Sequence, residues 1–221
     1  MEAAPPSPSQ CGGPGSSGGL SDNVPSDNVY LPVSFICLFE MTSNVDLSFK
    51  NLQGDIPSSI CSLKRLRLID LDENMLTVTS PSNMSHCISL HVMCIGSNRG
   101  LHRSILDEIG NIPSLLRLGL YNNSLTGSIL LSIENLSQLI ALSLAVNYLQ
   151  GSILVGIGNN AHHGFLQLST KSFSALLPPS SYNLSSLSML DMLGNKLHGR
   201  LPAAFCDRRK SIYWTYSSVT Y

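Results

Sequence analysis

A repeat of about 24 residues is the feature that most constrains how this chain can fold. The stretches "LGLYNNSLTGSILLSI" and "LSLAVNYLQGSILVGI" are two of seven copies of one pattern. The sixth residue of each copy follows that of the preceding copy by 24 residues, except for one step of 25 at the extra Gly100. These sixth residues are Lys50, Asn74, Asn98, Asn123, Asn147, Lys171 and Asn195. Such a period predicts a chain built from one supersecondary unit, stacked many times.

The start of each copy has the alternation of a short strand. Its first and third residues are apolar, so we expect them to point inward while the middle residue points outward. One copy cannot bury its apolar face alone, whereas stacked copies share a continuous core and one parallel sheet on a concave side. The repeat therefore predicts an α/β-type solenoid.

The consensus residues of the repeat also resemble those of a known family. Copies such as "VDLSFKNLQGDIPSSI" and "LDMLGNKLHGRLPAAF" resemble the 24-residue plant-specific leucine-rich repeat, which is typical of the ectodomains of plant receptor-like kinases and receptor-like proteins. The resemblance covers about Val45 to Cys206. It implies a right-handed leucine-rich-repeat superhelix of about seven repeats. Its return segments are expected to be mostly irregular or 3-10 helical.

The asparagines at the sixth position are predicted to be structural. A buried amide must find partners, and asparagine offers two donors and one acceptor oxygen. The resemblance implies that these groups bond the backbone of the same and adjacent repeats. Lys50 and Lys171 cannot accept hydrogen bonds, so we expect a weaker ladder there. The predicted ladder residues are Asn74, Asn98, Asn123, Asn147 and Asn195.

The junction between the fifth and sixth copies has the poorest match to the pattern. Asn160 and His163 stand where leucine is expected. Burying either side chain without partners would cost about 1–3 kcal/mol. The sequence therefore predicts local loosening around residues 158–172.

The outward positions of the predicted strands and the residues after them form the candidate ligand surface, because they are expected to be free of core packing. Asp70, Asp72 and Glu73 form a cluster that could meet a basic peptide, although a solvated acidic patch is the favoured interpretation. Aromatic side chains are scarce, with Tyr121 and, near the edge, Phe165. The candidate ligand face comprises Asp70, Asp72, Glu73, Tyr121, Ser143, Gln167 and Asp191.

Four N-x-S triplets are candidate N-glycosylation sites, at Asn83, Asn122, Asn135 and Asn183. Abundant Asn and Ser would produce one or two of them by chance. Four in a chain with only 12% charged residues fit glycosylation better, if the chain is secreted. Asn135 and Asn183 lie in the return-segment slot "NLS", so we favour these two as acceptors and expect them to face solvent.

The flanks of the repeats differ from them in composition. Residues 1–28 are rich in Pro, Gly and Ser and are predicted to be disordered. Residues 29–44 are expected to form a degenerate N-terminal flank or cap, residues 45–206 the solenoid, and residues 207–221 a tail outside the repeat. The six cysteines leave both structural disulfides and buried thiols open.

No motif in the chain supports catalysis, a cofactor or a metal site. "GIGNNA" resembles a dinucleotide fingerprint but falls in a return segment, and the adjacent His162 and His163 have no evident third ligand. A net charge of −1 argues against nucleic-acid binding. No signal peptide or membrane-spanning stretch is visible in the sequence.

These observations predict a noncatalytic recognition module, similar to a plant receptor ectodomain and related to signalling or defence. By resemblance, it would bind a peptide or protein ligand, or a leucine-rich-repeat co-receptor, and would be extracellular or associated with the plasma membrane. Two alternatives stay open: a truncated or decoy remnant without a ligand, and an intracellular scaffold. The flanks suggest a fragment of a larger ectodomain or a truncated gene product.

Overall fold

The computed structural model describes residues 43–213, except for 78–83, 103, 106, 160–161, 171, 181–183, 185 and 199–210. The segment 1–28, nearly all of the flank 29–44 and most of the tail 207–221 therefore lie outside the described residues. Asn83, Asn160, Lys171 and Asn183 do so as well.

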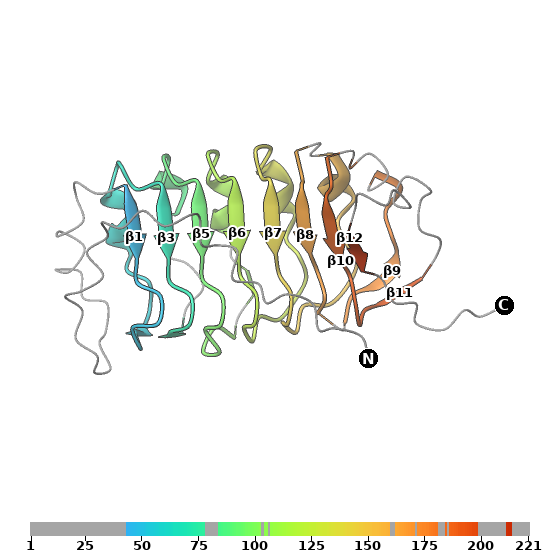
Figure 1. Ribbon diagram of the computed structural model, residues 1–221, viewed down its shortest axis with the longest axis horizontal. Helices are drawn as coiled ribbons and strands as arrows, with labels where there is room; N and C mark the ends of the chain where they lie inside the picture. The colour runs from blue at the N-terminus through green and yellow to red at the C-terminus, as the bar shows by residue number, and fades with distance from the viewer. Residues whose placement is uncertain are drawn as a thin grey trace.

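An eight-stranded parallel sheet forms one face of the molecule (Figure 1). Neighbouring strands follow one another in sequence order, and the pairs from β1 to β10 keep the register of the repeat, so that Val45 pairs with Ile69 and Leu118 with Leu142. The strands are β1 (Asn44–Asp46), β3 (Leu68–Asp70), β5 (Val92–Cys94), β6 (Arg117–Gly119), β7 (Ala141–Ser143), β8 (Phe165–Gln167), β10 (Met189–Asp191) and β12 (Ser211–Tyr213). This arrangement confirms the predicted solenoid with its parallel sheet.

The return segments contain short 3-10 helices, as predicted, and two small parallel sheets. The 3-10 helices lie behind the main sheet in Figure 1. They are η3 (Ser58–Ser62), η4 (Met84–His86), η5 (Asp107–Asn111), η6 (Leu131–Asn135) and η7 (Val155–Asn159). The small sheets pair β2 (Gln53–Gly54) with β4 (Met75–Leu76), and β9 (Ser174–Leu176) with β11 (Lys196–His198).

The core is one continuous stack of aliphatic side chains. In the repeat that contains β6, Leu118, Leu120, Leu125 and Ile129 are all buried, and their counterparts in the neighbouring repeats are buried with them. Gly127 lies in the turn of this repeat with φ +85°, a conformation that favours glycine because it has no Cβ. The repeated apolar positions of the sequence thus become one shared interior.

The sixth-position asparagines bond the backbone across repeats. The Oδ1 atom of Asn74 accepts the backbone N–H groups of Lys50 and Leu52, at 3.1 and 2.9 Å. Its Nδ2 donates to carbonyl oxygens of its own and the preceding repeat, those of Leu71 and Leu47. The same scheme recurs at the other four ladder residues, which are Asn98, Asn123, Asn147 and Asn195.

Thr170 precedes Lys171, which itself lies outside the described residues, and contacts both neighbouring repeats. Thr170 is buried, and its hydroxyl oxygen lies 3.1 Å from Oδ1 of Asn195 and 3.3 Å from the carbonyl oxygen of Leu149. The preceding residue therefore supplies a polar link between repeats where the asparagine is missing. The pattern at the sixth position alone does not predict this link.

The C-terminal tail contributes a strand that the repeat pattern did not predict. β12 lies in the segment assigned as a non-repeat tail, yet it pairs in parallel with β10 and extends the main sheet. Leu190 pairs with Ile212, an offset of 22 rather than 24 residues, so β12 falls outside the 24-residue register.

A disulfide joins Cys61 in η3 to Cys87, just after η4, in the next repeat. Both residues are buried, and 26 residues separate them in the sequence. Of the two possibilities that the sequence left open for these cysteines, the structure has the disulfide. The bond ties two consecutive return segments together near the N-terminal end of the sheet.

His163 takes a core position that leucine fills elsewhere. Leu139 and Leu187, one repeat before and one repeat after it, are buried, and His163 is itself only 3% exposed. Among the described residues, its Nδ1 atom has no hydrogen-bond partner. Burial lowers the pKa of His163 from 6.5 to about 4. The predicted loosening around residues 158–172 stays a prediction.

Replacing His163 with leucine is expected to raise the free energy of unfolding by about 1–3 kcal/mol at neutral pH, because it removes an unpaired buried polar group. Since the histidine pKa is lower in the folded than in the unfolded state, the wild type should also lose stability as the pH falls from 6.5 to 4. Urea unfolding of both proteins across this range measures both effects.

Comparing the wild type with His163→Leu isolates the contribution of the histidine to the pH dependence of stability. The pKa of the Asp70 carboxyl is raised to about 6, so this group destabilises the fold at high pH and opposes the trend. A stability difference between His163→Leu and wild type that does not widen below pH 6.5 would contradict the prediction.

Candidate functional site

Two rows of side chains run across the outer face of the main sheet. Because strand residues alternate, the first and third residues of each strand face away from the core. The front row holds the third residues: Asp46, Asp70, Cys94, Gly119, Ser143, Gln167 and Asp191. The back row holds the first residues: Asn44, Leu68, Val92, Arg117, Ala141, Phe165 and Met189.

The back row is mainly apolar and was largely missed by the sequence analysis. Leu68, Val92, Ala141, Phe165 and Met189 are each half-buried, so part of every side chain contacts solvent. From the "L-x-L" pattern we predicted only the middle residue of each strand to face outward, and of the back row only Phe165 was expected near the ligand face. The signal was available, since the residue two positions before an outward strand residue also points outward.

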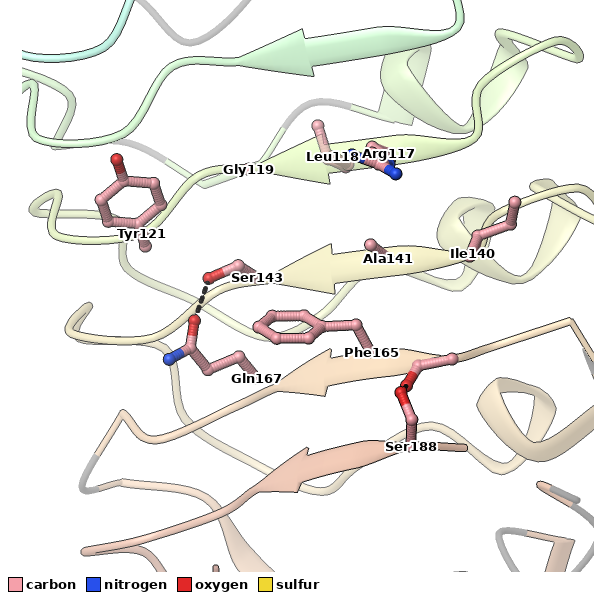
Figure 2. Close-up of a pocket in the computed structure, with 11 residues that line it drawn as sticks. Arg117, Leu118, Gly119, Tyr121, Ile140, Ala141, Ser143, Phe165, Gln167 and Ser188 are labelled. Atoms are coloured by element: carbon pink, nitrogen blue, oxygen red, sulfur yellow. Dashed lines mark hydrogen bonds between the residues drawn. The ribbon is translucent and has the colours of Figure 1, made fainter. Parts of the chain in front are cut away.

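A hollow of about 220 Å³ opens on this face over β6, β7 and β8 (Figure 2). Its floor is low because Gly119, Ala141 and Gly164 have small side chains or none. Tyr121, Ile140 and Phe165 stand around it as apolar walls, and Arg117 and Gln167 lie at its margin. An apolar depression with a few polar groups at its edge suits one large apolar side chain of a ligand.

Arg117 is the charged group at this hollow. Its side chain is exposed, and among the described residues the structure records no ion pair for it. An unpaired guanidinium beside an apolar hollow can bind an anionic group next to the apolar one.

Three of the predicted ligand-face residues form a hydrogen-bonded chain along the front row. The hydroxyl of Ser143 donates to Oε1 of Gln167 at 2.7 Å, and Nε2 of Gln167 lies 3.5 Å from Oδ2 of Asp191. Ser169 also donates to Asp191 at 3.0 Å. These bonds orient the polar edge of the hollow, which Figure 2 shows for Ser143 and Gln167.

Asp72 and Tyr121 are brought together although 49 residues separate them. The Tyr121 hydroxyl donates to Oδ2 of Asp72 at 2.6 Å, and the backbone N–H of Gly96 donates to Oδ1. Asp72 is 6% exposed and Tyr121 9% exposed. We expected both side chains to be free of core packing, but the structure buries them because each satisfies the other's polar group.

The carboxyls of this cluster have perturbed ionisation. Burial, as the largest cause, raises the pKa of Asp70 to about 6 and also raises that of Asp72. Burial and the bond to Asp72 raise the pKa of Tyr121. Ligand atoms of Asp70, Asp72 and Cys94 lie within 4.8 Å of one another, but Cys94 is disulfide-bonded and so offers no thiolate to a metal.

Glu73 follows Asp72 in the chain but, unlike Asp72, is not buried. It is exposed and lines a second depression, of about 290 Å³, together with Arg99 and Asn122. The Nδ2 atom of Asn122, the predicted glycan acceptor atom, donates to the Ser97 hydroxyl at 2.9 Å. Asn135, in contrast, is exposed at the end of η6.

Solved structures of plant receptors share this fold. The complex PEPR1–AtPEP1 superposes with a TM-score of 0.74 at 25% identity, over 84% of this chain and 26% of that one. The Arabidopsis receptor kinase HAESA, in complex with the peptide hormone IDA and the co-receptor SERK1, superposes with a TM-score of 0.67 at 28% identity, over 79% and 34%. The protein is a leucine-rich-repeat (LRR) solenoid. It is similar to plant LRR receptor ectodomains, as the sequence predicted.

The LRR fold alone is also shared more widely. The Leptospira interrogans LRR protein LIC12759 superposes with a TM-score of 0.67 at 24% identity, over 86% of this chain and 46% of that one. No protein-family model matches the chain, and no curated protein matches it significantly. The chain spans about a quarter to a third of the length of the receptor structures it matches. Within the part that the structure describes, no helix has the length and apolar character of a membrane span.

Proposed function

We propose that this LRR solenoid is a noncatalytic recognition module that binds a peptide or a protein segment along the outer face of its sheet. The observation that carries the proposal is the hollow over β6–β8, an apolar pocket with the exposed Arg117 at its margin. The front and back rows continue on either side of it. An extended ligand crossing the strands would place one apolar side chain in the hollow and rest its backbone on the rows.

The similar receptor structures support this choice of ligand, because PEPR1 is in complex with AtPEP1 and HAESA with the peptide hormone IDA. A co-receptor, as in the HAESA complex, is a further possible partner in this proposal. The proposed context is signalling or defence.

We also propose that the chain works outside the cell or at the plasma membrane. The buried disulfide between Cys61 and Cys87 supports this, since such bonds persist in oxidising compartments and are rare in the cytosol. Asn135 is the proposed glycan acceptor, because its side chain is exposed. Mass spectrometry of the Asn135 peptide from protein secreted by plant cells tests this placement, and an unmodified peptide would argue against it.

Filling the hollow should abolish binding. In the variant Ala141→Trp, an indole would occupy the hollow without entering the core, because Ala141 faces outward on β7. Peptides selected on wild-type protein from a random 14-residue phage library are expected to bind this variant at least about tenfold more weakly, as for loss of a central anchor. Isothermal titration with the synthetic peptides measures the change.

Asn44→Trp is the matched control. Asn44 has the same register position on β1, is exposed, and lies four strands from Ala141. The control should bind the selected peptides as the wild type does. Equal binding by wild type and Ala141→Trp would rule out the hollow as the anchor, and the absence of any selected peptide would favour the ligand-free alternative.

A further inference from the structure

Tyr121 connects the hollow with the acidic cluster two strands away. One side of the residue lines the hollow over β6–β8. Its hydroxyl points away from the hollow, toward β5, in Figure 2, and donates to Asp72 just after β3. The same side chain therefore belongs to a candidate binding surface and to a buried polar contact.

Gly96 provides the surface on which the Tyr121 ring rests. A Cβ atom built on Gly96 would lie 2.4 Å from Cε1 of the ring, so the ring lies directly over the backbone there. The Gly96 N–H also donates to Asp72, which holds the carboxylate beside the tyrosine hydroxyl. Contact with Gly96 fixes how far the Tyr121 ring lies above the backbone. The hydrogen bond to Asp72 fixes the direction in which the ring points along the sheet.

We propose that Asp72 is a positioning residue for the hollow, acting through Tyr121. This inference rests on the proposed function and deepens it, because it names what holds one wall of the ligand site. Asp72 does not line the hollow, and the hydrogen bond from Tyr121 is the contact that links it to this site. Without the carboxylate, the ring loses the bond that keeps it at the margin, and the hollow loses a defined wall.

The inference also predicts how binding depends on pH. An ionised Asp72 accepts the tyrosine hydroxyl more strongly than a protonated one does. The acidic groups around Asp72 are Asp46 on β1, Asp70 on β3 and the adjacent Glu73, and its pKa is raised above the ordinary aspartate value, chiefly by burial. Asp72 should therefore hold the Tyr121 wall of the hollow most firmly at neutral pH, and this wall should become more mobile as the pH falls.

The test uses N-acetyl-L-tryptophan, which carries an indole for the hollow and a carboxylate for Arg117. Titration of the whole protein, followed through the methyl NMR signals of Ile140 and Ala141, gives its dissociation constant at the hollow. Asp72→Asn and Tyr121→Phe are each expected to weaken binding by about three- to tenfold, in keeping with loss of a hydrogen bond to a charged group. Since both remove the same contact, the double variant should bind no more weakly than either single variant.

Asp55→Asn is the matched control. Asp55 also accepts a hydroxyl across repeats at 2.6 Å, from Thr77, but it does not line the hollow. This variant should bind the tryptophan derivative as the wild type does. Wild-type affinity should fall as the pH is lowered from 7, and this fall should be smaller in Asp72→Asn. Unchanged affinity in Asp72→Asn, or additive effects in the double variant, would overturn the inference.

A second measurement needs no ligand. Nuclear Overhauser cross-peaks between the Tyr121 ring and the Gly96 Hα protons should be strong in the wild type and in Asp55→Asn, and weak in Asp72→Asn. If the tryptophan derivative fails to bind the wild type, the hollow as a ligand site is rejected, while these cross-peaks still decide whether Asp72 positions Tyr121. Cross-peaks of equal strength in wild type and Asp72→Asn would reject that role.

Discussion

Replacing Cys61 and Cys87 together with alanine is expected to lower the free energy of unfolding by about 3–4 kcal/mol. This is the free energy that corresponds to the loop-closure entropy which a bridge of this span removes from the unfolded chain. The bridge closes a loop with a sequence separation of 26 residues. Both cysteines are buried between consecutive return segments, so the unbridged chain gains freedom in the unfolded state and loses core contacts in the folded one. Urea unfolding under non-reducing conditions, followed by circular dichroism, measures the loss.

The two single variants provide the control. Cys61→Ala and Cys87→Ala each break the same bond, so each should lose nearly as much stability as the double variant. A double variant as stable as the wild type would show that this disulfide contributes nothing to the fold.

Asn123→Ala is expected to cost about 2–5 kcal/mol of unfolding free energy, because it leaves a buried donor and a buried acceptor without this partner. The Oδ1 atom of Asn123 accepts the backbone N–H of Asn98 at 2.6 Å, and its Nδ2 donates to the carbonyl oxygen of Ile95 at 2.8 Å. These bonds link two repeats, so their loss should loosen the stack on the N-terminal side of Asn123. Denaturant unfolding gives the energy, and amide hydrogen exchange at Asn98 gives the location.

Asn135→Ala is the matched control for this variant. Asn135 is an exposed asparagine in η6, and a surface replacement away from special contacts changes stability by less than about 0.5 kcal/mol. Equal stability of Asn123→Ala and Asn135→Ala would show that the ladder bond at Asn123 does not hold the repeats together.

The sequence predicted the features that follow from its period. Leu118 and Leu120 recur at fixed spacing, and only a stack of strands with both residues inward buries all their copies at once. The parallel sheet and the 3-10 return segments followed from the same pattern and its resemblance. Strand β12 did not, because its offset from β10 departs from the 24-residue period.

The candidate site was less predictable than the scaffold. Alternation placed Ser143, Gln167 and Asp191 on the outer face, where the structure has them in a hydrogen-bonded chain. The hollow depends on small residues, among them Gly119 and Ala141, that come together only when three strands lie side by side. A sequence pattern shows which residues face outward, but not which of them combine to leave a hollow.

The sequence by itself determined the stacked architecture of this LRR solenoid, because stacking the repeats buries every copy of the apolar pattern in one shared core. Only the tertiary structure decided that Asp72 and Tyr121 pair rather than face solvent. Neither residue's immediate sequence neighbours indicate this bond. It forms because the repeats place the two side chains across β5, where the small Gly96 lets the tyrosine ring reach the carboxylate.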